Sequence, residues 1–471
     1  MSLKIKSSTG IKPELDPEFA PAVLWNREYS NAVKASGDGN KLIISLERGN
    51  GAVSSFETII FPHNDTYRKV NLKYVERLIK SLLWIKGGCK LYIAGCPTLA
   101  EEIKQIYSPD GHRNFDYEIM GGKIYGRQFE VISCELDDTP ENNEVQVKLG
   151  GNMDGCRIGF DLGGSDRKCA AVIDGKIVHS EEVEWNPYFE SNPQYHFDGI
   201  MDSLNRAAAK MPRVDAIGGS AAGVYVDNSP RIASLFRGVS ADNFSKYVVN
   251  IFERVRQEFN NVPMVIANDG DVTALAGAIS METTGVLGIA MGTSEAVGYV
   301  NEDGNITDWL NELAFVPIDY CDDAPVDEWS GDVGCGVQYL SQQAVARLAP
   351  AAGFAFPSDM PFPEQLIKVQ EAMSAGDLRA KKIYRTIGVY LGYAIAYYAE
   401  FYDMKNLLIL GRVASGTGGD LIVSVANDIL KAEFPDLAAK LTIRTPDEKF
   451  KRHGQAVIAA SLPALHKPDL N

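Results

Sequence analysis

Residues 158–173 read IGFDLGGSDRKCAAVI. Two short apolar runs flank a glycine-containing turn, which is the pattern of a β-hairpin. Asp161 stands near the end of the first run, and Gly163, Gly164 and Ser165 form the turn. Glycines let backbone N–H groups approach a phosphate closely, and a carboxylate at Asp161 suits a hydrated Mg²⁺ ion. An ordinary tight turn with a solvated aspartate has the same sequence pattern. The rest of the chain must therefore distinguish a phosphate-binding hairpin from an ordinary turn.

A second strand–turn–strand unit follows at 286–300. Its turn contains Met291-Gly292-Thr293-Ser294. The repetition predicts two similar lobes, each opening with a hairpin that faces a shared cleft.

Between these two units, a predicted strand at 264–267 runs directly into Asn268 and Asp269. A carboxylate at the end of a strand, before a helix, is a usual place for a catalytic group in α/β folds. The alternative for Asp269 is a helix N-cap, a role that aspartate fills readily.

The composition describes an ordinary globular chain. It has 471 residues, 45% of them hydrophobic, and a net charge of −16. Such an acidic balance argues against a nucleic-acid-binding surface over the whole molecule. No apolar run approaches the roughly 20 residues that span a bilayer, and the opening MSLKIKSSTG has no apolar signal core. We therefore expect a cytoplasmic protein without membrane or nucleic-acid partners.

Cysteines and histidines give no metal motif in the sequence. The seven cysteines are scattered, with no C-x-x-C pair, which favours free thiols in a reducing compartment. His179 and His196 have no partners at metal-ligand spacing, so we interpret both as isolated hydrogen-bonding histidines.

Residues 1–150 form a first α/β block in this interpretation. Predicted strands include 41–46, 58–61, 91–94 and 117–119, and apolar residues at helical spacing predict a helix over 71–85. The polar stretch 137–144 is interpreted as a linker or exposed loop near the end of the block. The block contains no catalytic motif and no convincing helix-turn-helix.

Seven segments of the remaining chain, taken in order, resemble the ROK family of sugar kinases and repressors. That family belongs to the actin-like, hexokinase-like ATPase superfamily, and the likeness spans roughly 156–465. The segments are FDLGGS (160–165), AIGGSAAGVYVD (216–227), ANDGDVTALAGA (267–278), GIAMGTSEAVGYV (288–300), NELAFVPI (311–318), AGDLRAKKIYRTIGVYLGYAIA (375–396) and LLILGRVASG (407–416).

The resemblance implies an α/β fold with two RNase H-like lobes and an extra N-terminal α/β block. The block would be 1–150, the first lobe 151–277 and the second lobe 278–453. A closing helix at 454–465 would return to the first lobe. A homodimer is compatible with this arrangement.

The resemblance also implies roles for single residues. Asp269 would be the catalytic base, and Asn268 and Glu312 would bind sugar hydroxyls; for Glu312 a solvated loop acid is the alternative. Asp161 would orient the hydration shell of Mg²⁺. The residues facing the phosphates of ATP would be Gly163, Gly164 and Ser165 in one lobe and Gly292, Thr293 and Gly411 in the other.

Two departures from the family pattern stand out. Three of the four positions of the family's zinc site are Phe315, Glu328 and Ser330 here, and of the thiols only Cys335 survives. We therefore expect no zinc. In the second phosphate turn, Glu295 brings a negative charge where the family has a run of glycines. On this interpretation Glu295 weakens ATP binding, and replacing it with glycine should tighten it.

These features favour an ATP-dependent kinase of a sugar or sugar derivative, a transferase that uses ATP and Mg²⁺. A catalytically silent sugar-binding sensor or scaffold on the same fold is the alternative, because fold does not fix function. A repressor is third, since the first block does not look like a winged helix.

Overall fold

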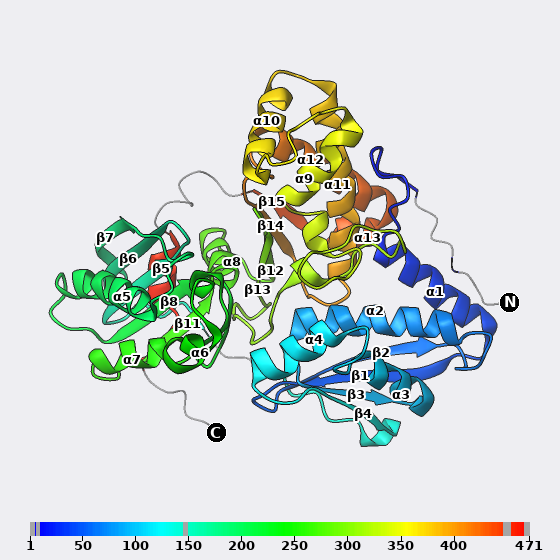
Figure 1. The fold of residues 1–471 in the computed structure, drawn as a ribbon, viewed down its shortest axis with the longest axis horizontal. Coiled ribbons are helices and arrows are strands. Elements are labelled where there is room, and N and C mark those ends of the chain that lie inside the picture. The colour runs from blue at the N-terminus through cyan, green and yellow to red at the C-terminus, as the bar shows by residue number, and fades with distance from the viewer. Residues whose placement is uncertain (1–4, 6–9, 145–148, 446–453, 466–471) are drawn as a thin grey trace. The chain divides into compact units, whose positions relative to one another are not determined.

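The computed structural model describes residues 5, 10–144, 149–445 and 454–465. The chain forms two compact units (Figure 1). Unit 1 contains Met1–Val145, Ile289–Val297 and Asp308–Arg444, and unit 2 contains Gln146–Gly288, Gly298–Thr307 and Thr445–Asn471. The N-terminal block thus belongs to the same unit as most of the second lobe. The two hairpin stretches 158–173 and 286–300 lie in different sheets, as the sequence predicts.

Unit 2 is built on a five-stranded sheet of order β11-β8-β5-β6-β7. The three strands β11, β8 and β5 are parallel, whereas β6 and β7 are antiparallel to their neighbours. The strands are β5 (Cys156–Leu162), β6 (Asp166–Ile173), β7 (Lys176–Glu184), β8 (Ala216–Ala221) and β11 (Met264–Asn268), and a small ribbon of β9 (Val224–Val226) and β10 (Ser229–Ile232) accompanies them. The helices are α5 (Pro193–Ala208), α6 (Ala241–Asn243), α7 (Ile251–Glu258), α8 (Asp269–Ser280) and α14 (Gly454–Ala460).

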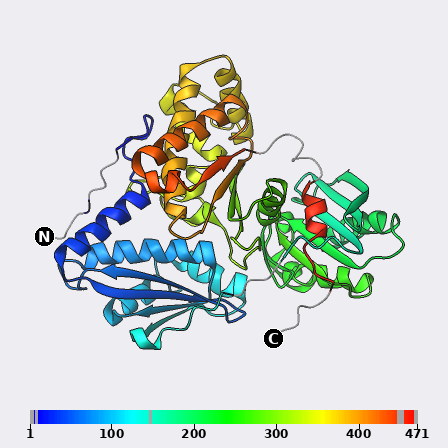
Figure 2. The ribbon, with the colours of Figure 1, turned by 180° about the vertical axis from the view of Figure 1, so that it is seen from behind.

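The two faces of this sheet differ because side chains alternate along each strand. On one face, Ile158 and Phe160 of β5 join a large core with α5 and α7. On the other face, a Cβ at Gly159 or Gly218 would lie 1.7 Å from a backbone oxygen of α14. The glycines therefore let α14 pack directly on β5 and β8, as Figure 2 shows in red.

Unit 1 contains a second sheet of order β13-β12-β14-β15. Its strands are β12 (Val286–Met291), β13 (Glu295–Val300), β14 (Asn406–Leu410) and β15 (Thr442–Arg444), and its helices are α9 (Gln342–Ala352), α10 (Phe362–Ser374), α11 (Leu378–Tyr398), α12 (Gly416–Glu433) and α13 (Pro435–Ala438). The ends of β12 and β13 extend into unit 2. Gly388 and Gly392 bring α11 close to Val425 and Ile429 of α12.

The N-terminal block of unit 1 is a four-stranded sheet of order β2-β1-β3-β4. Its strands are β1 (Asn40–Glu47), β2 (Val53–Ile60), β3 (Lys90–Ala94) and β4 (Glu130–Cys134), and its helices are α1 (Ala22–Ser36), α2 (Arg68–Lys86), α3 (Pro97–Ile106) and α4 (Asn114–Glu118). The long helix α2 runs alongside the sheet in Figure 1 and buries both apolar and charged residues.

A cluster of buried charges joins α2 and α4 to the segment around Asp332. The Asp332 carboxylate is paired with Arg77 at 2.9 Å, with Lys80 at 3.3 Å and with Arg113 at 2.8 Å. Asp116 accepts a hydrogen bond from Lys80, and Glu76 pairs with both arginines. Three cations thus face three carboxylates, and the pairing offsets the large cost of removing each charge from water.

Several element predictions need correction. Residues 117–119 are not a strand, because Tyr117 and Glu118 end helix α4. Apolar residues at helical spacing predict a single helix over 241–259, but the structure divides this stretch into α6, a π-helical turn at Phe244–Val248, and α7. The closing helix ends at Ala460 rather than at 465. Strand β7 was not foreseen, since its sequence KIVHSEEVE is mostly polar. Within the described residues, the helices are all too short or too polar to cross a membrane.

Candidate functional site

Polar residues meet at the carboxyl edge of three parallel strands in unit 2. Asp161 of β5 lies beside Ser220 of β8 in the strand register, and Ala221 lies beside Asn268 of β11. Asp269 follows immediately as the first residue of α8. In open α/β sheets this edge is where ligands bind. The structure thus places Asp161, Asn268 and Asp269 at the same edge of this sheet.

Asp161 is buried at this edge, on the sheet face that α14 covers. Its Oδ1 accepts a hydrogen bond of 2.7 Å from the Ser220 hydroxyl, and Lys168 Nζ lies 3.7 Å from its Oδ2. Burial raises the pKa of the Asp161 carboxyl, while Ser220 and Lys168 oppose the shift. Sequence reasoning missed both partners. The alternation of side chains could have placed Lys168 on the face of Asp161, once the hairpin register was known.

Asp269 is not the helix cap. That role belongs to Asn268, whose Oδ1 accepts from the Gly270 N–H at 2.7 Å and whose Nδ2 donates to the Gly223 carbonyl at 2.8 Å. Asp269 Oδ1 also accepts from the Gly270 N–H, at 3.0 Å. Burial, followed by the nearby charge of Asp161, raises the pKa of Asp269 to about 6. A carboxyl that titrates near neutral pH is suited to act as a general base.

The first hairpin turn is tight and packed. The Gly163 N–H donates to the Asp166 carbonyl at 2.9 Å, and the Trp185 indole donates to the Gly163 carbonyl. A Cβ at Gly164 would lie 2.2 Å from the Tyr188 hydroxyl, so the close approach at this glycine is to a side chain of the protein itself. The Ser165 hydroxyl is exposed and donates to the Asp166 carboxylate.

The second turn lies in unit 1 and contains Gly292 and Thr293. The Gly292 N–H donates to the Ser294 carbonyl at 2.9 Å, and the side chains of Thr293 and Ser294 are exposed. Gly411, at the end of β14, has φ +92°, and a Cβ there would lie 2.4 Å from the Met291 carbonyl oxygen. The glycine therefore lets the ends of β12 and β14 meet beneath this turn.

Glu295 does not bring an exposed charge to the second turn, contrary to the sequence expectation. Its side chain is 3% exposed and points inward, where Tyr398 Oη donates to Oε1 at 3.4 Å. Oε2 has no hydrogen-bond partner among the described residues and lies against Gly336. Burial, opposed by Tyr398 and reinforced by the charge of Glu312, raises the pKa of Glu295 to about 8. The carboxyl is therefore mostly protonated at neutral pH, so like-charge repulsion of phosphate does not follow.

This burial gives a test. Because the folded pKa of Glu295 is above the ordinary glutamate value of 4.5, the favourable contribution of its protonated form is complete below pH 4.5 and is lost as the pH rises through about 8. Glu295→Gln removes the titration but keeps the shape. The variant should therefore gain melting temperature over wild type at alkaline pH and little at acidic pH, with unchanged affinity for Mg-ATP. Equal melting curves at every pH would contradict the buried position.

Glu312 is held by the N-terminal block. Its N–H donates to the Trp84 carbonyl at 2.9 Å, and the preceding Asn311 N–H donates to the Ile85 carbonyl at 3.0 Å. These carbonyls belong to the last turn of α2, where no further helical N–H can reach them. The Trp84 ring stacks on Phe315 with centroids 4.1 Å apart. Glu312 belongs to unit 1, whereas Asp161 and Asp269 belong to unit 2.

The residues at the positions of the family's zinc site make packing contacts and hydrogen bonds with other residues of the protein. Phe315 packs on Trp84, and Ser330 donates its hydroxyl to Asp327 at 2.6 Å. The Cys335 thiol is buried 4.0 Å from Asp332, and burial raises its pKa to about 12. Hydrogen bonds and the buried charge cluster thus hold this loop to the N-terminal block.

Comparison with known proteins finds solved structures that share this fold. No family model matches the chain, and no curated protein does. Among solved structures, a ROK hexokinase from Thermus thermophilus superposes with a TM-score of 0.51 at 17% identity, covering 65% of this chain and 97% of that one. A ROK family transcriptional regulator, described as a homologue of the E. coli MLC protein, superposes with a TM-score of 0.50 at 16% identity. This match covers 66% of this chain and 79% of that one.

At these identities the likeness concerns the fold. It agrees with the α/β fold class predicted from the sequence. About two-thirds of the chain therefore has the fold that this ROK hexokinase and this ROK transcriptional regulator share.

Proposed function

We propose that the protein phosphorylates a hydroxyl group of a sugar or sugar derivative with ATP, and that Asp269 is the general base. The observation that carries this proposal is the environment of Asp269. The side chain of Asp269 lies at the C-terminal ends of parallel strands, and the neighbouring Asn268 caps the helix. The pKa of Asp269 is about 6.

In the proposed reaction, Asp269 accepts the proton of the attacking hydroxyl. The hydroxyl oxygen forms a bond to the γ-phosphorus of ATP, and the bond from that phosphorus to the β-phosphate oxygen breaks, releasing ADP. This chemistry requires mainly positioning and charge neutralisation from the protein. Asn268, whose side chain is fixed by Gly223 and Gly270, would offer its amide edge to the sugar from a fixed position.

The residues of this edge fit a Mg²⁺ ion held through water. Asp161 and Asp269 raise the electrostatic cost of each other's charge, and a hydrated divalent cation would lower that cost. When bound, Mg²⁺ would neutralise phosphate charge. Asp161 would orient the water shell, with Ser220 fixing the rotamer of its carboxylate. Gly163, Gly164 and Ser165 in unit 2, and Gly292, Thr293 and Gly411 in unit 1, are the proposed phosphate-facing residues.

For the N-terminal block we propose a positioning role. The carbonyls of Trp84 and Ile85 bind the backbone at Glu312 and Asn311, and Trp84 packs on Phe315. Helix α2 thereby fixes the conformation of the proposed sugar-binding segment. This role would explain why the block belongs to the same compact unit as 308–444 rather than to a separate module.

A catalytically silent sugar-binding sensor or scaffold is the second candidate. One observation favours it: the second turn has exposed Thr293 and Ser294 side chains and a buried Glu295 where close-approach glycines would suit phosphate. In a sensor of this kind, Asp269 and Glu312 would serve binding alone.

Nucleotide binding separates the two candidates. A ligand that binds only the folded protein stabilises it by RT ln(1 + [L]/Kd), about 2.7 kcal/mol at a hundredfold excess over Kd. Under the kinase proposal, Mg-ATP should raise the melting temperature in a concentration-dependent way, and ATP with EDTA should do so less. A melting temperature that rises with sugars and does not respond to Mg-ATP would contradict the kinase and favour the sensor.

A further inference from the structure

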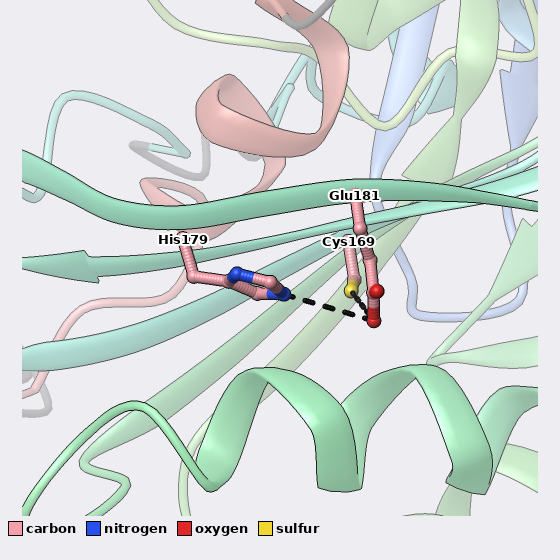
Figure 3. Close-up of side chains that lie close together, drawn as sticks. All are labelled: Cys169, His179 and Glu181. Carbon is pink, nitrogen blue, oxygen red and sulfur yellow. Dashed lines mark hydrogen bonds and ion pairs between the residues drawn. The ribbon is translucent and has the colours of Figure 1, made fainter.

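Three potential metal ligands meet on strands β6 and β7 of unit 2 (Figure 3). Cys169 of β6 is the direct cross-strand partner of Glu181 of β7, and His179 stands two residues before Glu181 on the same face. Glu181 Oε1 lies 3.7 Å from His179 Nε2 and 3.8 Å from Cys169 Sγ. All three ligand atoms lie within 4.8 Å of one another. The expectation that His179 is isolated is therefore wrong.

We propose that Cys169, His179 and Glu181 bind a zinc ion. Zinc sits about 2.0–2.3 Å from nitrogen, oxygen and sulfur ligands, and in a tetrahedron such ligands are about 3.3–3.8 Å apart. Two of the three pairs, at 3.7 and 3.8 Å, meet this requirement, and His179 and Cys169 lie within 4.8 Å of each other. A thiolate, an imidazole and a carboxylate form a donor set that suits zinc better than magnesium or calcium, which prefer oxygen ligands.

The environment of the three side chains supports the same assignment. The His179 Nε2 atom is buried and has no hydrogen bond to any described residue, although it is aimed at Glu181. A buried nitrogen without a hydrogen-bond partner destabilises the folded protein unless another group or ion binds it. The Cys169 thiol is buried in the core, whereas the side chains of His179 and Glu181 are 23% and 26% exposed. A zinc ion could therefore enter from solvent and keep water as its fourth ligand.

The thiol proton of Cys169 and the positive charge of a nearby arginine oppose zinc binding. Cys169 would bind zinc as a thiolate, so zinc must displace the thiol proton. One proton is thus released to solvent as the S–Zn bond forms. Arg206 of α5 has its Nη1 atom 3.8 Å from Glu181 Oε2 and competes for that carboxylate. Affinity should therefore rise with pH and should rise when the Arg206 charge is removed.

This site is separate from the edge that carries Asp269. Cys169 belongs to the core that packs on α5, whereas the neighbouring Lys168 reaches Asp161 on the opposite face of the sheet. The ion would cross-link the edge strand β7 to β6 and would not touch the proposed reaction. It is also unrelated to the positions around Cys335. The sequence expectation of no zinc rested on those positions alone.

The experiment is a zinc titration of metal-free protein by calorimetry, with elemental analysis after dialysis against zinc chloride. Wild type should bind one zinc, with proton release. His179→Gln and Cys169→Ser should each weaken binding by about 10²-fold or more, because a tetrahedral site with one ligand removed loses much of its binding energy. The matched control Cys321→Ser should behave as wild type, and Arg206→Gln should bind zinc more tightly.

Cobalt(II) gives a second readout that does not depend on stability. Cobalt-loaded wild type should show a thiolate-to-cobalt charge-transfer band, which Cys169→Ser should lose while its circular dichroism stays that of wild type. If Cys169→Ser fails to fold, the partly exposed His179→Gln variant decides the question. Zinc affinity equal to wild type in His179→Gln, or no stoichiometric zinc bound by wild type, would overturn the proposal.

Discussion

Replacing Asp269 with asparagine is expected to lower kcat for sugar phosphorylation by about 10²–10⁴-fold, the usual contribution of a positioned general base. Asparagine keeps the shape of the side chain and can still accept the Gly270 N–H, but it cannot take a proton. Since the folded pKa of about 6 lies above the ordinary aspartate value of 3.8, the ionised Asp269 costs stability above about pH 6. The variant should therefore melt no earlier than wild type at neutral pH.

The pH profile and a matched variant make this test specific. Wild-type kcat/KM should rise with pH through about 6, because the free base must be ionised. Asp271→Asn, two residues further along α8, makes the same chemical change at a carboxylate that accepts the Tyr299 N–H. This control should keep kcat close to wild type. Full turnover in Asp269→Asn would remove Asp269 from the role of base.

Replacing Asp332 with alanine is expected to destabilise the protein by about 3–5 kcal/mol, because removing one partner of a buried ion pair leaves an uncompensated charge. Here Arg77, Lys80 and Arg113 would lose a shared carboxylate in a buried site. The free energy of unfolding from urea denaturation measures the effect. Since the same cluster fastens α2, which binds the Glu312 backbone, KM for the sugar should also rise under the proposed function.

An exposed aspartate in the same region supplies the control for Asp332. Asp322 pairs with Lys73 of α2 at 2.6 Å, but its side chain is 90% exposed. Exposed ion pairs contribute about 0–1 kcal/mol to the free energy of unfolding. Asp322→Ala should therefore have nearly the same free energy of unfolding as wild type. Equal stabilities of the two variants would mean that the buried cluster does not hold the N-terminal block in place.

The features that the sequence predicts correctly are those determined by short local patterns. The hairpin at 158–173 is predictable because two apolar runs and a glycine turn determine it within 16 residues. The position of Asp269 follows from an apolar strand that ends at Asn268. Strand β7 is not predictable in this way, because an edge strand with polar residues lacks the apolar signal.

The remaining features depend on contacts between distant segments. Glu295 looks like a phosphate-facing charge in the sequence, but Tyr398, 103 residues further along the chain, lies beside its carboxyl. The pairing of Asp332 with Arg77 joins residues 255 positions apart. The trio of Cys169, His179 and Glu181 requires the cross-strand register of β6 and β7, which a bulge near Ala171 alters. Periodicity and spacing carry no information on such pairings.

The central claim is that the protein transfers phosphate from ATP to a sugar hydroxyl, and ADP release measured across a broad panel of sugars with Mg-ATP tests it most directly. The account predicts that at least one sugar raises ADP release above the rate with ATP alone. It also predicts that this increase is lost in Asp269→Asn and retained in Asp271→Asn. No sugar-dependent ADP release by the wild-type protein would contradict the kinase and leave Asp269 and Glu312 as residues of a binding protein.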